Sequence, residues 1–342
     1  DPGIDANRRV RELIDRTGVV DGYAMVFGCT DTEYLEALVT NTRLHVIAVV
    51  PGHAEADRMR RRFDDAGIHG ARIEVHAGEP ATFSAPDYLS SLTIVEGASR
   101  VDAALVKHLF TLMRPYGGVL ELKGAGLDER TLGELARKAD CGGAQIRTSG
   151  GVVQLVRQGP LPGSGIWTHN YGDIANTAKS DDRLVKLPLG LLWFGGSSNL
   201  DVLPRHGHGP AEQVIGGRLY IEGLDCLSAR DVYTGRVIWK RTLLDLGTFG
   251  VYYDGTYRDA PTDTRYNQVH IPGANLRGTN FIATLDRVYV LQGSDCVVLD
   301  SATGETVATF RRPPVDPKAE KKPYPEWGYI GVAGDYLIGG YG

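Results

Sequence analysis

An internal repeat in the second half of the chain restricts the possible folds more than any other feature of the sequence. The segment GRLYIEGLDCLSARDVYTGRVIW (217–239) matches DRVYVLQGSDCVVLDSATGETVATF (286–310). Aligning Arg218 on Arg287 gives an offset of 287 − 218 = 69 residues, and GDYLIGGYG (334–342) begins a third copy. Each copy holds several short strand-like segments between turn signals. A repeat of this size and content is typical of a β-propeller with loop insertions.

The number of copies is too small for a closed ring. About two and a half units are present, whereas propellers usually have about 4 to 8 blades. Each blade buries its faces only against its neighbours. We therefore expect further blades or a protein partner outside these residues, and a longer protein of which this chain is a piece. Residues 249–278 are expected to be a loop insertion between two copies.

The first 155 or so residues follow a different pattern, in which apolar strands alternate with helices. Continuous apolar strands separated by helices predict a parallel sheet covered on both faces. Predicted helices cover residues 5–16, 31–40, 54–66, 101–113 and 129–139. Predicted strands cover residues 23–27, 44–50, 71–77, 91–97 and 151–158, with one more after the turn PYGG (115–118). The expected domains are an α/β domain over 1–158, a linker GPLPGSG over 159–165, and all-β blades over 166–342.

Composition excludes several classes of function. A net charge of −5 and a pI near 6.0 give no electrostatic footprint for nucleic acid or an anionic membrane. No apolar window is long enough for a transmembrane helix. The four cysteines are far apart and form no C-x-x-C motif, so neither a zinc site nor a dense disulfide framework is predicted. They are Cys29, Cys141, Cys226 and Cys296.

The segment ARDVYTGRVIW (229–239) fits the pattern A-x-D-x-x-T-G-x-x-x-W. This pattern resembles the tryptophan-docking repeat of the quinoprotein (PQQ-like) β-propeller family. The residues that carry it are Ala229, Asp231, Thr234, Gly235 and Trp239, and the second copy keeps Asp300, Thr303 and Gly304 but has Ala308 in place of the tryptophan. We expect the Asp and the Thr-Gly turn to close a hairpin and the tryptophan to fill the gap between blades. Residues 166–196 also look like the first strand and first blade of that family.

Quinone dehydrogenases of this family bind PQQ with a calcium ion, near a vicinal disulfide. No Cys-Cys pair and no carboxylate cluster stand out here, so the sequence does not favour binding of PQQ or calcium. Many family members, such as the outer-membrane assembly propellers, bind no quinone and serve as scaffolds.

One further candidate site is a metal site in RHGHGP (205–210). His206 and His208 would share one face if this segment were a strand, and His169 or His270 could join them. We favour the alternative that these histidines bond backbone groups in a glycine-rich loop, and therefore no metal is predicted.

The first half resembles the class I S-adenosylmethionine-dependent methyltransferases. The resemblance is carried by the glycine after the first strand (MVFGCT), by HAGEP after the third, by IVEG at the end of the fourth, and by the leader LMRPYGGVLEL. It implies S-adenosylmethionine as cofactor, Gly28 as the loop glycine and Glu79 as the acid that meets the adenine amino group. It also implies Glu96 as the candidate catalytic residue. Ligands of open α/β sheets bind beyond the carboxyl ends of the strands, where these residues would converge.

The same segment departs from that family at two places. The cofactor loop reads GCT instead of G-x-G, which removes a glycine that would let the backbone approach a ligand. The acid that chelates the ribose hydroxyls should stand near 50 or 51, where the sequence has Val50-Pro51. Asp31 could reach the methionine end of a cofactor, or it could cap the helix that follows.

A methyltransferase-like domain joined to such a propeller resembles large exported proteins of planctomycete-type bacteria, which implies a periplasmic or cell-surface location. Our leading hypothesis is an envelope protein that acts as a binding and assembly platform and carries a degenerate methyltransferase-like domain. Two alternatives remain: an active S-adenosylmethionine-dependent methyltransferase, and a quinoprotein dehydrogenase.

Overall fold

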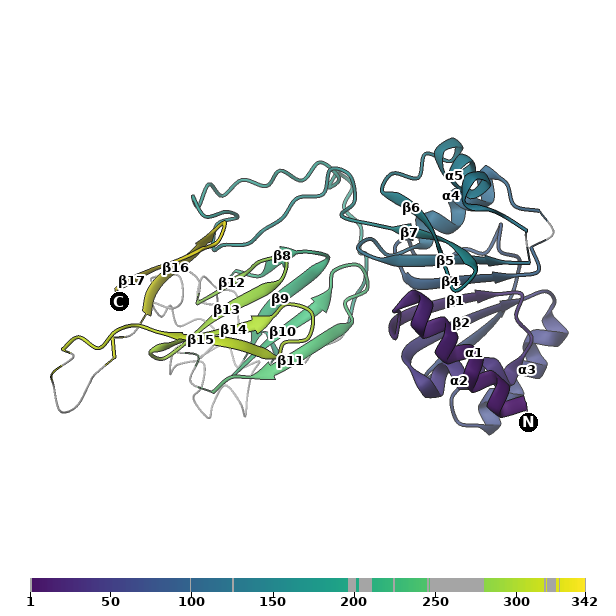
Figure 1. The fold of residues 1–342 in the computed structure, drawn as a ribbon, viewed down its shortest axis with the longest axis horizontal. Coiled ribbons are helices and arrows are strands. Elements are labelled where there is room, and N and C mark those ends of the chain that lie inside the picture. The colour runs from purple at the N-terminus through teal and green to yellow at the C-terminus, as the bar shows by residue number, and fades with distance from the viewer. Residues whose placement is uncertain are drawn as a thin grey trace. The chain divides into compact units, whose positions relative to one another are not determined.

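The computed structural model divides into two compact units, Asp1–Pro162 and Gly163–Gly342, whose boundary falls inside the predicted linker. Each unit is described by itself (Figure 1). The structure describes residues 2–98, 100–124, 126–195, 201–202, 211–223, 225–244, 246, 280–316, 318, 324–325 and 327–341.

The first unit alternates helices and strands through most of its length. Its helices are α1 (Pro2–Thr17), α2 (Thr32–Asn41), α3 (His53–Asp65), α4 (Ala103–Leu112) and α5 (Glu129–Lys138). Its strands are β1 (Asp21–Phe27), β2 (Arg43–Val50), β3 (Ile73–Ala77), β4 (Ser90–Glu96), β5 (Gly118–Lys123), β6 (Ala144–Ser149) and β7 (Val152–Arg157).

These strands form one seven-stranded sheet in the order β3-β2-β1-β4-β5-β7-β6. The pairs β2·β3, β1·β2, β1·β4 and β4·β5 are parallel. The chain builds outward from β1 to β3, then returns to the other side of β1 and builds outward from β4. The connections that follow the neighbouring parallel strands β1 and β4 therefore lead to opposite sides of the sheet, which places a crevice at the carboxyl ends of these strands.

Both faces of this sheet are covered by helices, as Figure 1 shows. Alternate residues of β1 enter opposite cores, because successive side chains of a strand point to opposite faces. Ala24 and Val26 pack with α1, α2 and α3, whereas Met25 and Phe27 pack with α4 and α5. Each of α2, α4 and α5 begins with an aspartate whose carboxylate accepts a backbone N–H three residues later. These capping residues are Asp31, Asp102 and Asp128.

The expectation of a wholly parallel sheet is wrong at one edge. β7 pairs antiparallel with β5, and β6 pairs antiparallel with β7. Gly150 and Gly151, which both have positive φ, form the tight turn between β6 and β7. The sequence pattern did not predict β6, because this edge strand is only partly buried and lacks an apolar run.

The second unit contains small antiparallel sheets. One sheet has the order β11-β10-β9-β8 and a second has the order β12-β13-β14-β15, while β16 and β17 form a two-stranded sheet. The strands of the first sheet are β8 (Gln213–Ile215), β9 (Arg218–Gly223), β10 (Cys226–Asp231) and β11 (Val237–Thr242). Those of the second are β12 (Phe281–Ala283), β13 (Arg287–Gln292), β14 (Asp295–Asp300) and β15 (Thr306–Arg311). The last two strands are β16 (Trp327–Ala333) and β17 (Tyr336–Tyr341).

The 69-residue repeat of the sequence is also a repeat of structure. The starts of β9, β10 and β11 are displaced by 287 − 218, 295 − 226 and 306 − 237 from those of β13, β14 and β15, which is 69 each time. The two turns that precede β11 and β15 are the same. Asp231 Oδ1 accepts the N–H groups of Tyr233 and Thr234 at 2.9 and 3.2 Å. Asp300 Oδ1 accepts those of Ala302 and Thr303 at 2.9 and 3.0 Å.

The indole of Trp239 joins the two four-stranded sheets. Its Nε1 donates to the carbonyl oxygen of Ser301 at 3.0 Å, and its ring lies against Gly304. A Cβ atom at Gly304 would be 2.7 Å from this ring, so the turn needs glycine there for the close approach and for its φ of 73°. Gln213, which is fully buried, also links the sheets through hydrogen bonds with Phe281 O and Ala283 N.

Several expectations for the blades are either not met or lie outside the described residues. No strand is assigned within the described residues 166–195, where a first blade was expected, and only an isolated bridge joins Trp167 to Val214 there. The expected insertion 249–278 and the candidate metal ligands His206 and His208 lie outside the described residues. The described part of the unit contains small sheets and does not show a closed propeller.

Candidate functional site

A pocket of about 230 Å³ lies in the first unit where the carboxyl ends of the first four strands meet. It occupies the crevice created by the reversal of strand order at β1 and β4. Three residues singled out by the sequence line it, namely Gly28, Glu79 and Glu96. The remaining lining residues are Pro51, Gly78, Pro80, Ala81, Gly97, Ala98, Arg100 and Leu105.

Gly28 is required by the neighbouring strand. Its φ is 77°, and a Cβ atom at this position would lie 2.5 Å from the backbone oxygen of Glu96. Its own N–H donates to Val49 O at 2.8 Å. The backbone of β4 therefore occupies the space that a side chain at this residue would need, and the glycine does not open that space for a ligand.

Glu96 is paired with a lysine of the chain. Lys123 Nζ donates to Glu96 Oε1 at 3.0 Å, and about a quarter of each side chain is exposed. The two residues end the adjacent parallel strands β4 and β5 and stand opposite each other in the register. The carboxylate is thus already neutralised by a cation from the next strand.

Cys29 occupies the centre of the loop that follows β1, and its side chain is 1% exposed. Burial, together with the nearby charge of Glu96, raises the pKa of this thiol to about 12. The thiolate is the nucleophilic form of cysteine, so at neutral pH Cys29 stays protonated and unreactive.

Asp31 caps α2 and forms an ion pair with α1. Its Oδ1 accepts the Tyr34 N–H at 3.0 Å, and its Oδ2 accepts from Arg9 at 2.6 Å. Although burial acts to raise it, these hydrogen bonds and the Arg9 charge hold the pKa of Asp31 below its usual value. The Arg9 guanidinium also lies 4.5 Å from the centre of the Tyr34 ring. Asp31 is not among the described residues that line the pocket.

Glu79 lies in the connection between β3 and β4, which contains no helix. The residue is exposed, and its backbone oxygen accepts from Thr82 and Phe83 in a short turn. Phe83 then packs edge-on to Phe27, with ring centres 6.1 Å apart. Its carbonyl oxygen accepts from His108 Nε2 of α4 at 3.0 Å. The connection is thereby held across the end of the sheet, with Phe83 occupying space beside the pocket.

The position expected for a ribose-binding acid has no acidic side chain. β2 ends at Val50, which is fully buried, and Pro51 lines the pocket. Gly52, with a φ of 85°, then begins α3 without a side-chain cap. The pocket is also smaller than the roughly 300 to 1,000 Å³ that is usual for small-molecule sites. The fit to a nucleoside cofactor is therefore poor in both volume and hydrogen-bonding groups.

Other kinds of site find no support in the described residues. Among them, no group of three or more His, Cys, Asp or Glu side chains is placed to hold a metal ion. The four cysteines are buried free thiols. None of the described helices has the length and apolar character needed to span a bilayer.

Sequence reasoning missed Arg9 and Lys123, the cations that pair with two of the acidic candidates. It also missed Arg100, which lines the pocket. A signal for Lys123 was present, because an acid and a base end two consecutive predicted strands that lie side by side in a parallel sheet. No local signal pointed to Arg9, since its contact with Asp31 depends on how α1 packs against α2.

Comparisons with known proteins give distant structural likeness only. No family model matches the chain, and no curated protein matches it. The chain is similar to the structure of a putative S-adenosyl-L-methionine-dependent methyltransferase from Methanococcus maripaludis, at 15% identity and a TM-score of 0.35, over 44% of this chain and 84% of that one. It is also similar to a putative sarcosine dimethylglycine methyltransferase from Galdieria sulphuraria, at 14% identity and a TM-score of 0.34, over 42% of this chain and 63% of that one.

At these identities and TM-scores the neighbours carry no information on activity. The first unit has a Rossmann-like, methyltransferase-like fold on the evidence of its own mixed seven-stranded sheet, with the pocket at the point where the strand order reverses.

Proposed function

We propose that this chain is part of an envelope protein that serves as a binding and assembly platform, and that its methyltransferase-like unit does not use S-adenosylmethionine. The observation that carries the proposal is the pairing of two of the three acidic candidates, Asp31 and Glu96, with cations of the chain itself. Arg9 lies 2.6 Å from Asp31, and Lys123 lies 3.0 Å from Glu96.

These ion pairs matter because S-adenosylmethionine is itself a cation at its methionine end, with a sulfonium and an ammonium group. A carboxylate that already accepts a charged hydrogen bond gains little from a second cation, and the second cation is repelled by the first. To bind the cofactor there, the site would have to break a pair that is half buried. Arg9 and Lys123 thus supply the positive charges that a cationic ligand would otherwise bring to these carboxylates.

The residues at the end of β2 also argue against cofactor binding. With Pro51 at the end of β2, the ribose hydroxyls would find no carboxylate there, and each polar group left unpaired on burial costs about 1–3 kcal/mol. The residues present therefore do not fit the cofactor.

The platform role is supported by the second unit. Its repeated sheets dock on one another through Trp239 and Gln213, and the docking residues are structural rather than catalytic. Stacked sheets of this kind present broad surfaces for a partner. The envelope location is proposed on the resemblance of the combined domains to exported propeller proteins.

Calorimetric titration with S-adenosylmethionine tests the proposal on the purified chain. We expect no binding heat up to millimolar cofactor, both for the chain and for the Glu79→Ala variant. Micromolar binding that Glu79→Ala abolishes would overturn the proposal.

One observation favours a second candidate, an active S-adenosylmethionine-dependent methyltransferase. Gly28, Glu79 and Glu96 do line a single pocket at the end of the sheet where this class binds its ligand. In that case Glu79 would meet the adenine amino group and Glu96 would act at the catalytic edge. The same titration separates the two candidates.

A further inference from the structure

Trp193 contacts the first four-stranded sheet in the way that Trp239 contacts the second. Trp193 Nε1 donates to Val232 O at 2.9 Å, and Trp239 Nε1 donates to Ser301 O at 3.0 Å. The two acceptors are equivalent positions of the repeat, since 301 − 232 = 69. The indole of Trp193 also covers Gly235, the equivalent of the glycine under Trp239.

This equivalence places Trp193 where the tryptophan of a fourth strand would lie. Trp239 belongs to β11, the fourth and outermost strand of its sheet, which is held by pairing with β10, where Ala229 stands opposite Trp239. Residues 184–195 have no such pairing among the described residues. Residues 184–195 contact the next sheet through Trp193, just as β11 contacts the next sheet through Trp239. Unlike β11, they have no third strand beside them among the described residues.

The missing third strand is not in the residues just before Trp193. In the repeat, Ala, Asp, Thr and Gly precede the tryptophan by 10, 8, 5 and 4 residues, as in 229–239. The residues at those distances from Trp193 are Arg183, Val185, Pro188 and Leu189. No hairpin turn of the repeat can form from them.

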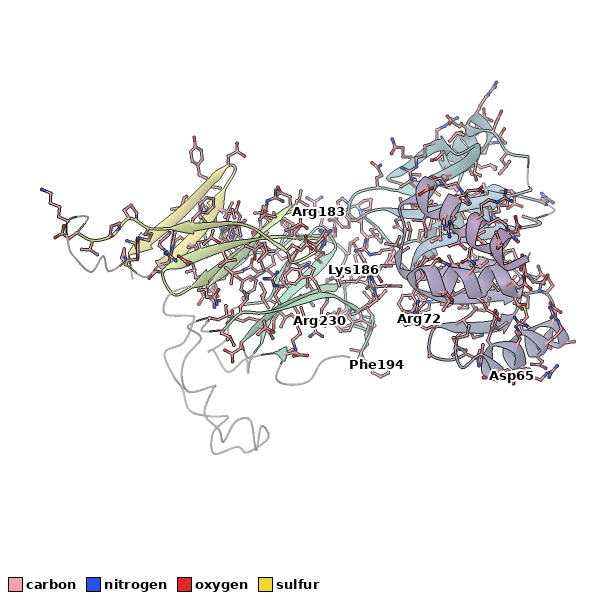
Figure 2. The ribbon with its side chains drawn as sticks, turned by 60° about the horizontal axis from the view of Figure 1, so that its bottom comes forward. Asp65, Arg72, Arg183, Lys186, Phe194 and Arg230 are labelled. Carbon is pink, nitrogen blue, oxygen red and sulfur yellow. The ribbon has the colours of Figure 1, made fainter. Side chains whose placement is uncertain are left out.

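The same segment exposes large apolar side chains. Leu187, Leu191 and Phe194, the last labelled in Figure 2, are 86%, 86% and 89% exposed. Leu184, Val185, Leu189 and Leu192 are exposed as well. Contiguous exposed apolar surface on a soluble protein marks a contact site. A sheet that pairs with this segment would cover it.

We propose that residues 184–194 are the fourth strand of a further antiparallel sheet of the same repeat, whose first three strands belong to the same polypeptide outside these 342 residues. The methyltransferase-like unit is then an insertion within one sheet, between its third and fourth strands. In both described sheets one tight turn joins these two strands, so the third strand is expected next to the fourth along the chain, with the inserted unit in place of the turn. This inference depends on the propeller part of the proposed function, and not on the state of the cofactor site.

Site-specific photo-crosslinking tests the occupant of this surface. A photoreactive phenylalanine analogue replaces Leu191 in the protein expressed from its complete natural gene, and cross-linked peptides are identified by mass spectrometry. We expect the main product to be an intramolecular link to a strand that precedes a Thr-Gly turn outside these 342 residues. The control is the same replacement at Leu285, which is 61% exposed and lies in a turn of the second sheet. It is expected to give no such link.

Three results would overturn the inference. One is a complete gene that encodes no further repeat. Another is cross-linking only to a second copy, which mixing of isotope-labelled and unlabelled protein reveals. The third is cross-linking only to a different protein. Replacement at Leu187 repeats the test if the Leu191 variant does not fold. Cofactor binding is read by calorimetry and not by cross-linking, so failure of this inference and failure of the cofactor proposal are separate results.

Discussion

The ammonium of Lys123 lies 3.0 Å from the carboxylate of Glu96, at the ends of two adjacent parallel strands. Both residues stand where the crevice of the sheet would present an acid to a ligand. The pair compensates the charge of Glu96 at the edge of the pocket. It also shows that an acid at the expected position in the sequence is not by itself evidence for a working site.

Restoring the two missing features should create cofactor binding. Lys123→Met frees the carboxylate of Glu96, and Pro51→Asp supplies an acceptor for the ribose hydroxyls. An acceptor for a buried polar group is worth about 1–3 kcal/mol, so the added Asp should strengthen binding by roughly 5- to 150-fold. We expect measurable S-adenosylmethionine binding by calorimetry in the double variant. Lys138→Met with Pro51→Asp is the matched control, since Lys138 is exposed on α5. Equal binding by both would disprove a role for the Lys123 ion pair.

Gly28→Ala should destabilise the first unit more than Gly18→Ala. Both glycines have positive φ, 77° and 71°, where a side chain costs about 1–2 kcal/mol. A Cβ atom has open space at Gly18 but meets the backbone of Glu96 at Gly28. Overpacking against backbone should add about 1–3 kcal/mol. The free energies of unfolding in urea give the comparison, and equal losses would mean that β4 moves aside at little cost.

His169 should make the second unit sensitive to acid. It is 5% exposed, and its Nε2 accepts the Val332 N–H at 3.3 Å while Nδ1 bonds the Thr168 hydroxyl at 2.9 Å. Burial lowers the pKa of His169, although the charge of Asp173 opposes this. Below pH 6.5 the unfolded chain therefore binds a proton that the folded chain resists.

The free energy of unfolding should accordingly fall as the pH drops below about 6.5, by at most about 1.4 kcal/mol per pH unit from this group. His169→Gln keeps a neutral polar side chain and should flatten this part of the profile, measured by urea unfolding between pH 7 and pH 5. An unchanged slope in that variant would assign the acid sensitivity to other groups.

Removal of the Trp239 indole should separate the two four-stranded sheets. Trp239→Ala leaves a cavity between them and should cost about 3–5 kcal/mol in the stability of the second unit. Trp239→Phe keeps most of the apolar contact but loses the hydrogen bond to Ser301 O, and should cost less. Leu285→Ala, at an exposed position, should change stability by no more than about 0.5 kcal/mol. Similar losses for Trp239→Ala and Leu285→Ala would show that the docking contributes nothing.

The sequence predicted the fold well where local pattern and tertiary packing agree. The apolar runs before Gly28 and at 44–50 are strands because both of their faces are buried, and the helix after Asp31 begins at the capping residue that the sequence offered. The repeat offset of 69 was visible because the Asp and Thr-Gly turn is a local structure, built from side-chain bonds to the backbone two and three residues later. β6 was missed because an edge strand needs no apolar run.

The site was less predictable, since its chemistry depends on contacts between distant elements. Gly28, Glu79 and Glu96 were brought together as expected from strand ends. Glu96, however, is paired with Lys123, 27 residues away, and Asp31 with Arg9, 22 residues away. The choice for Asp31 between a cap and a ligand contact could only be made once α1 was seen to lie against α2. The weak metal-ligand candidates His206 and His208 lie outside the described residues and stay untested.

The four cysteines are all buried, and none of them is joined to another. In an oxidising compartment a shielded thiol has no access to small disulfides or to an exchange catalyst, and in a reducing one there is no bond to lose. The described fold is therefore indifferent to redox poise. It can form in either kind of compartment, and reductants in a purification buffer should leave its stability unchanged.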